Sequence, residues 1–410
     1  MTPLELRIAW RNVWRNPRRT GLTVAATVFA VVLVMVAVAL GAGTHEKMIE
    51  DSVRVNAGHV LVSGTDYLEK RTLEQFVSYD ASLEARLAAA EGVRGVAPRV
   101  VSFGLLSQDQ STRGVAVVGV DPEREGDVTT LPIRVTTGRF LLPDARREIV
   151  LGNRLAKVLQ AEIGDEVLLY SIAYSLETAY ELFTVVGVMK LPEVNMDRTL
   201  AVISLADAQS FFVYDDRVSE IAILADDSDA VPALARSVER AVAGTPTEVH
   251  TWRESMPELE QFIILDDAGM YITLAILVVV VGFGILNTIL MAVLERQREF
   301  GVVLALGLRP LAIFRIVYLE SLVLALVGLG VGLAIALPLI LYLQANPVTL
   351  TGDMAGAVEL FGFEPQVTWK LKPLNPIGSI ATILGVAVVA ALYPAVKASR
   401  GRPVDALRSL

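Results

Sequence analysis

The sequence predicts an α-helical membrane protein with four transmembrane helices and one α+β extracytoplasmic domain inserted between the first two helices. Three observations predict this fold. Hydrophobic residues make up 53% of the 410 residues, more than is usual for a soluble protein, yet 20% are charged. The apolar residues gather in four long runs, and residues 43–267, between the first and second runs, are of mixed polarity.

The four apolar runs are each long enough to span a membrane, since a hydrocarbon core of about 30 Å takes roughly 20 helical residues. They cover residues 21–42, 268–294, 312–343 and 374–396. The third run contains Arg315, Glu320 and Pro338. We still expect it to span, because Ser321–Leu343 is uncharged and long enough.

The distribution of basic residues predicts the topology, because short cytoplasmic loops are rich in Lys and Arg. Basic residues flank the spans in segments 1–20, 295–311 and 397–410. We therefore expect an inner-membrane protein with both termini in the cytoplasm and with residues 43–267 and 344–373 on the far side. Lys370 and Lys372 are exceptions to this rule. A cleaved signal peptide is the alternative for the N-terminus, but the first apolar run is longer than is typical of one.

The pattern of the outer segment predicts an α+β domain, in which β-branched runs indicate strands and a longer apolar period indicates helices. Expected strands are His59–Ser63, Val115–Val120, Glu166–Ser171, Phe183–Met189, Leu200–Ser204 and Ser219–Leu224. Expected helices are Ser82–Ala90, Asn153–Gln160, Leu205–Phe212 and Val231–Ala243. We expect two lobes, with one, residues 115–225, inserted into the other.

Charge and motifs exclude several functions. The net charge of −9 arises mainly in the outer segment, so no nucleic-acid partner is predicted. There is no cysteine, and the three histidines lack zinc-protease spacing, so we expect no metal site. No phosphate-binding loop and no nucleophile elbow are present. We expect no catalytic residue and no cofactor in this chain, and any ATP would be bound by a partner.

The segment that follows the second span carries the clearest motif. Glu295, Arg296, Arg298 and Glu299 form a charged turn, and the amphipathic stretch Phe300–Leu306 ends at Gly307. Such a pattern is typical of a short helix at the membrane interface. It is either a charged anchor and turn or a coupling helix that fits a groove on a soluble motor subunit.

This motif resembles the signature of the FtsX/MacB/LolC-LolE superfamily of ABC transporter permeases. The matching positions are Glu295, Arg296, Arg298, Glu299, Gly301, Ala305, Gly307, Glu320 and Ser321. Phe300 departs from the pattern, which usually has Ile. The C-terminal YPAVKASRGRPVDALR resembles the family's ending through Pro394, Ala395, Ala398, Pro403, Ala406, Leu407 and Arg408, and AWRNVWRNPRRTGLT resembles its amphipathic N-terminal helix. Outer-segment strings such as AGHVLVSGTDY and REIVLGNRLAKVL are most similar to the lipoprotein-releasing, LolC/LolE-like branch.

The resemblance implies a MacB-like periplasmic core domain and a mechanism called mechanotransmission. Two permease chains, identical or homologous, would assemble with two ATPase subunits that bind ATP and Mg, and a periplasmic lipoprotein carrier is a further implied partner. The implied coupling residues are Glu295, Arg296, Arg298, Glu299, Gly301, Ala305 and Gly307. The implied lateral cleft for acylated cargo is lined by Val31, Met35, Val38, Met270, Leu274 and Leu277.

Some residues inside the spans have two interpretations. Arg315 and Glu320 are functional candidates because ionisable residues are costly in a membrane. Alternatively, Arg315 extends to the interface and Glu320 pairs with a neighbouring helix. We expect close helix packing at Gly328 and Gly332, which have the G-x-x-x-G spacing, or at Gly282 and Gly284; alternatively, these residues reflect only that glycine is common in membrane helices.

Three functions follow from these observations. The first is a permease that releases lipoproteins from the inner membrane. The second is a permease of the same architecture that works with a periplasmic adaptor in efflux, or that signals to a cell-wall hydrolase or peptide sensor. The third is a membrane-anchored enzyme or scaffold that does not depend on ATP.

Overall fold

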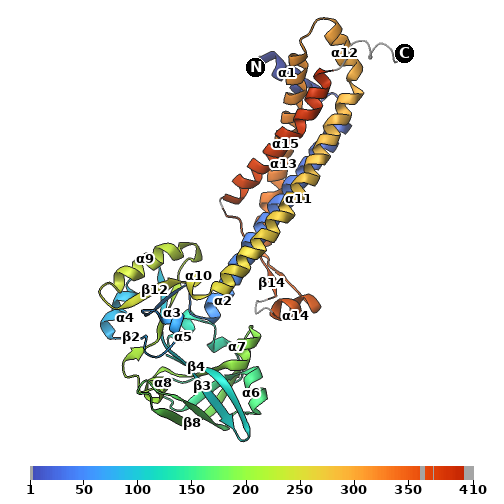
Figure 1. The fold of residues 1–410 in the computed structure, drawn as a ribbon. Coiled ribbons are helices and arrows are strands. Elements are labelled where there is room, and N and C mark those ends of the chain that lie inside the picture. Colours follow the sequence, from blue (N-terminus) through green and yellow to red (C-terminus); the bar gives the residue numbers. More distant parts are fainter. Residues whose placement is uncertain (1–2, 361–364, 373, 401–410) are drawn as a thin grey trace. The chain divides into compact units, whose positions relative to one another are not determined.

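The computed structural model describes residues 3–360, 365–372 and 374–400 and divides the chain into two compact units (Figure 1). One unit, here called the membrane unit, comprises residues 1–45, 264–348 and 366–410. The other, the outer unit, comprises residues 46–263 and 349–365.

Four helices of the described residues are long and apolar enough to cross a membrane, which confirms the predicted number of spans. They are α2 (Pro17–Val55), α11 (Pro257–Glu295), α13 (Pro310–Ala345) and α15 (Leu374–Ser399). Two short helices complete the membrane unit, α1 (Pro3–Val13) before the first span and α12 (Gln297–Ala305) after the second. Figure 1 shows α1 and α12 at the same end of this unit as the last turns of α15.

The spans α2 and α13 pack closely through the predicted glycine pair. A Cβ added at Gly328 would lie 2.6 Å from Thr27 Cβ, and one at Gly332 would lie 2.6 Å from Val31 Cβ. Because both approaches are closer than real Cβ atoms allow, only glycine permits this contact. The G-x-x-x-G spacing in α13 therefore has a packing role.

The outer unit is an α+β domain whose strands form one ten-stranded sheet and a small two-stranded one. Its strands are β1 (Val60–Gly64), β2 (Val77–Ser78), β3 (Val93–Gln108), β4 (Ser111–Val120), β5 (Val135–Gly138), β6 (Glu148–Gly152), β7 (Glu166–Ile172), β8 (Thr178–Met189), β9 (Leu200–Ser204), β10 (Arg217–Val218), β11 (Glu220–Ala225) and β12 (Thr247–Thr251). Its helices are α3 (Tyr67–Lys70), α4 (Ala81–Ala88), α5 (Glu125–Val128), α6 (Asn153–Leu159), α7 (Val194–Thr199), α8 (Leu205–Phe211), α9 (Val231–Ala241), α10 (Trp252–Ser255) and α14 (Asp353–Leu360). The pair β13 (Val348–Thr349) and β14 (Gln366–Val367) flanks α14 in sequence.

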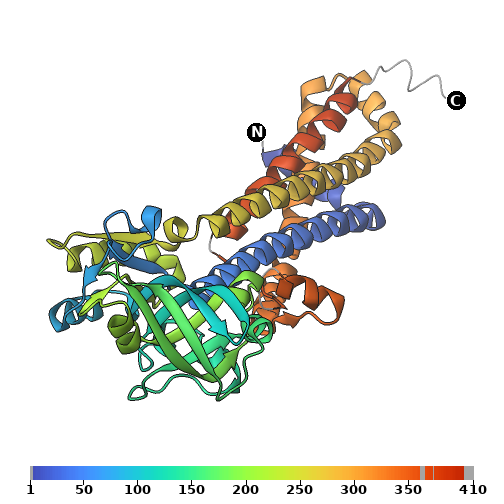
Figure 2. The ribbon, with the colours of Figure 1, turned by 60° about the horizontal axis from the view of Figure 1, so that its bottom comes forward.

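Six strands of the large sheet close on themselves. The pairings run β3–β4–β9–β6–β8–β7, and β7 pairs with β3 again, which completes a ring. A closed ring leaves none of these strands as a free edge. Inward-facing apolar side chains such as Val117, Leu169 and Phe183 fill it. Figure 2 shows these strands in the cyan to green part of the chain.

The second lobe of the outer unit is a four-stranded sheet in the order β12–β1–β11–β3. Helices α4 and α9 cover it, with Leu83 and Leu87 packed among the same buried residues as Leu234 and Val238. The strand β3 belongs to both lobes, because its first residues pair with β11 and its last with β7.

The boundaries of these lobes differ from the expected insertion of residues 115–225. The strand β11, at the end of that range, lies in the four-stranded sheet, where Ile221 and Ile223 join its core. The ring also includes the second half of β3, which precedes residue 115. The cause is the 16-residue β3, which crosses between the lobes and which the sequence interpretation missed because Gly95, Pro98 and Gly104 interrupt its pattern.

Candidate functional site

The coupling segment, residues 295–311, folds as a short helix between two spans. The second span ends at Glu295, and Arg296, with φ −105° and ψ 13°, separates it from α12. The helix ends at Gly307, whose φ of 93° is in the left-handed region. There the Leu308 and Gly307 amides donate to the carbonyls of Val303 and Leu304, a pairing that favours glycine at this position.

Four charged side chains join α12 to the neighbouring segments. Arg15, between α1 and α2, donates to the Glu299 carboxylate from Nη2 at 2.7 Å and from Nη1 at 3.2 Å. Arg296 Nε donates to Oε2 of Glu299 at 3.1 Å. Its Nη1 donates to Glu320 of α13 at 3.1 Å. We call Arg15, Glu299, Arg296 and Glu320 the rim ion-pair chain.

The two ends of this chain differ in burial. The side chains of Arg15 and Glu299 are 63% and 44% exposed, whereas those of Arg296 and Glu320 are 16% and 9% exposed. The hydrogen bond from Arg15 lowers the pKa of Glu299 below its usual value, and Arg296 acts in the same direction. The Arg15–Glu299 pair is therefore solvated, whereas the Arg296–Glu320 pair is held between helices.

Phe300 and Glu320 both contact the guanidinium of Arg296. The guanidinium of Arg296 lies 5.3 Å from the Phe300 ring centroid, a cation–π arrangement. The departure from the usual Ile at this position therefore places an aromatic face beside the arginine. Glu320 pairs with a neighbouring segment, as one of the two interpretations of this residue proposed. The adjoining cavity of about 20 Å³ has room for no more than a water.

The other predicted coupling residues lie around this chain. Gly301 is buried on the inner face of α12, whereas Glu295, Arg298, Ala305 and Gly307 are exposed. Arg315 is exposed in the first third of α13. The coupling role of this set is not tested by the structure and stays a prediction.

Arg15 is the member of the chain that the sequence interpretation missed. It lies 284 positions from Glu299, and five arginines occur in the N-terminal segment, so no local signal distinguishes it. The neighbouring Arg18 is exposed and lies outside the chain of ion pairs.

The predicted cargo-cleft residues do not share one open surface. Val31 and Met35 are 0% and 2% exposed and pack against Leu329 and Ala336 of α13. Val38, Leu274 and Leu277 are partly buried beside the same cluster, and Met270 contacts Gly41. The cleft stays a prediction, and Val31 and Met35 become accessible only if α2 separates from α13.

The C-terminal motif is described in part. Ala395 and Ala398 of α15 are buried against Ile313 and Val317 of α13, so their small side chains allow these helices to pack. Pro394 lies inside the helix. The remaining motif residues, Pro403, Ala406, Leu407 and Arg408, lie outside the described residues.

Within the described part of the chain, no group of three His, Asp or Glu side chains could hold a metal ion. His45 instead lies between two carboxylates, with Nε2 2.7 Å from Asp266 and Nδ1 3.3 Å from Asp267. This contact joins α2 to α11 within the membrane unit.

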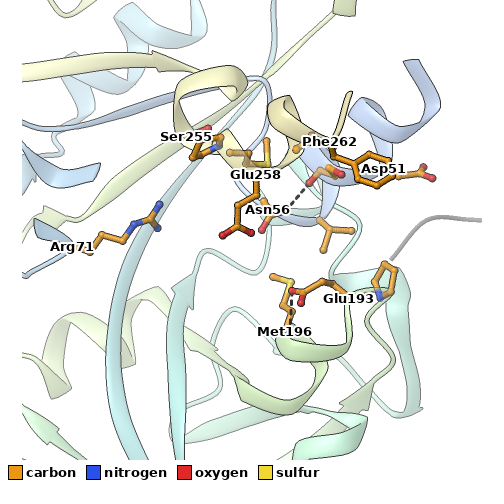
Figure 3. Close-up of a pocket in the computed structure, with 14 residues that line it drawn as sticks. Asp51, Asn56, Arg71, Glu193, Met196, Ser255, Glu258 and Phe262 are labelled. Atoms are coloured by element: carbon orange, nitrogen blue, oxygen red, sulfur yellow. Dashed lines mark hydrogen bonds between the residues drawn. The ribbon is translucent and has the colours of Figure 1, made fainter. Parts of the chain in front are cut away.

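The outer unit has a cavity of about 470 Å³ beside the end of α2 (Figure 3). Its carboxylates include Asp51 and Glu193. Glu193 accepts hydrogen bonds from the amides of Asn195 and Met196 and so caps α7, and Asp51 pairs with Lys47 at 2.7 Å. These two carboxylates thus have structural partners.

Comparison with known families agrees with this architecture. Residues 20–241 match the family model of the MacB-like periplasmic core domain, and residues 271–403 match that of the FtsX-like permease C-terminal region. The chain belongs to this family of permeases. The coupling segment and α13 lie within the second match, and the outer unit falls mainly within the first.

Similar curated proteins include two lipoprotein-releasing system transmembrane proteins. The permease is 27% identical to LolC of Neisseria meningitidis serogroup B over 78% of this chain and 79% of that protein. It is 24% identical to LolE of Haemophilus influenzae over 82% of each chain. A macrolide export ATP-binding/permease protein, MacB of Neisseria meningitidis serogroup A, is 21% identical over 90% of this chain but only 55% of that protein. The resemblance to the LolC/LolE-like branch is thereby confirmed.

Proposed function

We propose that this chain is the permease subunit of an ABC transporter that releases lipoproteins from the inner membrane by mechanotransmission. The observation that carries the proposal is α12, a short helix between two spans whose ion pairs reach both the segment before the first span and the third span. Similarity to the lipoprotein-releasing proteins over most of both chains supports lipoproteins as the cargo.

The surface of α12 supports an ATPase subunit as the partner. Val302, Leu306 and Leu308 are 53%, 82% and 37% exposed on or just after this helix. Exposed apolar side chains beside exposed charges, here Glu295 and Arg298, are typical of a protein interface. In the proposed assembly two ATPase subunits bind ATP and Mg, and each receives the α12 of one permease chain. The second permease chain is identical or homologous.

The outer face of the six-stranded ring supports a soluble carrier as a further partner. Apolar side chains point outward from three adjacent strands, and they are Phe103, Leu105, Leu168, Tyr170, Ile172, Tyr180 and Leu182. The strand register places Leu105 opposite Tyr170 and Tyr170 opposite Tyr180, so the surface is continuous. Contiguous exposed apolar surface of this kind marks an interaction site. A protein that accepts acylated cargo would need such a contact.

The proposed orientation places the coupling segment and both termini in the cytoplasm and the outer unit on the far side. The basic residues of segments 1–20 and 295–311 support this orientation. An ATPase in the cytoplasm would then reach α12 directly.

The second candidate function is efflux with a periplasmic adaptor. The similarity to a macrolide export protein favours it, although the chain spans only about half of that protein's length. The two functions differ in their cargo and in the partner of the outer unit.

Purification of the permease from its native membrane, followed by mass spectrometry, tests the proposal. We expect an ATP-binding subunit and triacylated lipoprotein to copurify with it. An ATPase together with an adaptor and no lipoprotein would favour the second candidate. A permease that brings no ATPase would contradict both.

The carrier surface is tested by the Tyr180→Asp variant, which places a charge in the apolar patch. We expect wild-type ATP hydrolysis but loss of lipoprotein transfer to a soluble acceptor. Arg113→Asp, at an exposed position of the neighbouring β4, is the control and should transfer normally. Equal transfer by Tyr180→Asp and wild type would remove the carrier from the proposal.

A further inference from the structure

The Arg15–Glu299 ion pair, here called the clasp, connects two segments that are not neighbours in the chain. Covalently, α12 is connected only to α11 and α13. The first span, α2, begins at Pro17, two residues after Arg15. The clasp is thus a direct polar contact from α12 to the beginning of the first span.

The geometry of the clasp is specific, although its burial is low. Two guanidinium nitrogens of Arg15 face the two oxygens of Glu299, a two-point contact that fixes orientation as well as distance. Exposed ion pairs contribute little to folding stability. A contact that fixes orientation but contributes little to folding stability is suited to positioning one segment on another.

The remainder of the rim ion-pair chain continues this connection. Glu299 also accepts from Arg296, and Arg296 reaches Glu320 inside the third span. The chain therefore alternates in charge and connects the beginning of α2, α12 and α13. The helix α2 is continuous from Pro17 to Val55, so a displacement at its beginning moves the whole helix.

We infer that Arg15 is a positioning residue that makes the beginning of the first span move together with α12. This inference rests on the proposed function, in which a partner ATPase displaces α12. Through the clasp, that displacement reaches α2 directly as well as α11 and α13. Loss of Arg15 removes no side chain from the proposed ATPase contact surface, because Val302, Leu306 and Leu308 lie on or just after α12.

The first experiment measures the position of the N-terminal helix. The chain has no cysteine, so Arg7→Cys in α1 and Gln297→Cys in α12 can carry spin labels without interference. We expect a narrow distance distribution in the labelled permease and a broader one when Arg15→Gln is added. Arg18→Gln, which removes the same charge three residues away, is the matched control and should keep the narrow distribution. An unchanged distribution in Arg15→Gln would overturn the inference.

The second experiment measures lipoprotein release per ATP hydrolysed in proteoliposomes that hold the permease and its copurified ATPase. We expect Arg15→Gln to lower this ratio about fivefold, the effect of losing one exposed ion pair. Arg15→Lys keeps the charge but not the two-point contact and should fall between wild type and Arg15→Gln. The double variant Arg15→Gln/Glu299→Gln should be no worse than Glu299→Gln alone, because both remove the same contact.

The outcomes separate this inference from the proposed function. If the wild-type permease couples hydrolysis to release and Arg15→Gln does so equally well, the inference fails and the proposed function stands. If the wild type recruits no ATPase, the proposed function fails and the inference fails with it. Additive losses in the double variant would also contradict the inference, since they would place the two residues in separate contacts.

Discussion

Two groups of ion pairs, one in each unit, use similar residues in different surroundings. In the outer unit, Arg99 is 5% exposed and contacts Glu125, which is fully buried, while Glu220 lies 3.9 Å away. In the membrane unit, the clasp is largely solvated. Burial makes the first group costly to break, whereas the second can be lost at little cost to folding. The difference separates charges that hold a fold together from charges placed to orient one segment on another.

The buried group, here called the Arg99 network, fixes the junction between the end of α2 and the sheet. Arg99 of β3 donates to the carbonyl of Asn56, directly after α2, at 2.5 Å. It also donates to Glu125, which accepts a hydrogen bond from Thr129 at 2.5 Å. The network therefore holds the chain that leaves the first span against the sheet of the outer unit.

The largest expected effect is the loss of Arg99. Arg99→Met leaves Glu125 and Glu220 buried without their cation and should destabilise the outer unit by about 3–5 kcal/mol. Denaturant unfolding of the full-length permease in detergent measures this loss. Arg15→Gln is the comparison variant in the same assay. If the two variants were equally stable, burial would not distinguish the two groups.

The second prediction asks whether the membrane unit depends on helix packing more than on its ion pairs. Gly332→Ala places a Cβ against Val31 and should cost about 1–3 kcal/mol through overpacking. Gly330→Ala, two residues away with nothing within 4 Å of its Cβ, is the matched control and should be close to neutral. Thermal unfolding in detergent compares them. Equal melting temperatures would show that α13 adjusts freely and that the close contact contributes little.

The third prediction concerns pH and the Arg99 network. Burial raises the pKa of Glu220 above its usual value, against the opposing effect of Arg99. An acid with a raised pKa in the folded state contributes stability that is complete below the unfolded pKa, about 4.3, and is lost as pH rises through the folded value. Glu220→Gln should therefore match wild type near pH 4 and exceed it in melting temperature at neutral pH. A constant difference between the two proteins across this range would contradict the assignment.

The smallest expected effect is that of the clasp on stability. Arg15→Gln should change the free energy of unfolding by no more than about 1 kcal/mol, and high salt should remove even this difference by screening. The same salt should leave the loss in Arg99→Met nearly unchanged. Since Arg15 lowers the pKa of Glu299, the clasp is present at neutral pH and is lost as pH falls through that lowered value. A large, salt-resistant loss of stability in Arg15→Gln would assign the clasp to folding.

The sequence predicted those features that depend on local pattern. The length of the apolar runs predicted the four spans, and Gly307 marked the end of α12, since each signal is contained in one continuous stretch of sequence. The spans themselves run further than expected, because the polar turns Glu46–Val55 and Pro257–Asp267 continue α2 and α11 without an apolar signal.

Features that depend on distant residues could not be predicted. The closure of the six-stranded ring requires β7 to pair with β3, and strand pairing leaves no trace in either strand alone. The clasp likewise joins residues 284 positions apart. Glu320 was recognised as unusual because a carboxylate in a span needs a partner, but the sequence did not identify Arg296 as that partner.

The most direct test of the central claim is ATP-dependent release of a triacylated lipoprotein from proteoliposomes that contain the permease and its copurified ATPase. Wild type and Glu299→Gln are compared, with ATP hydrolysis measured in the same samples. The account predicts release by the wild type, and in Glu299→Gln continued hydrolysis with release that falls well below wild type. Undiminished release by Glu299→Gln, or no release by the wild type, would contradict it.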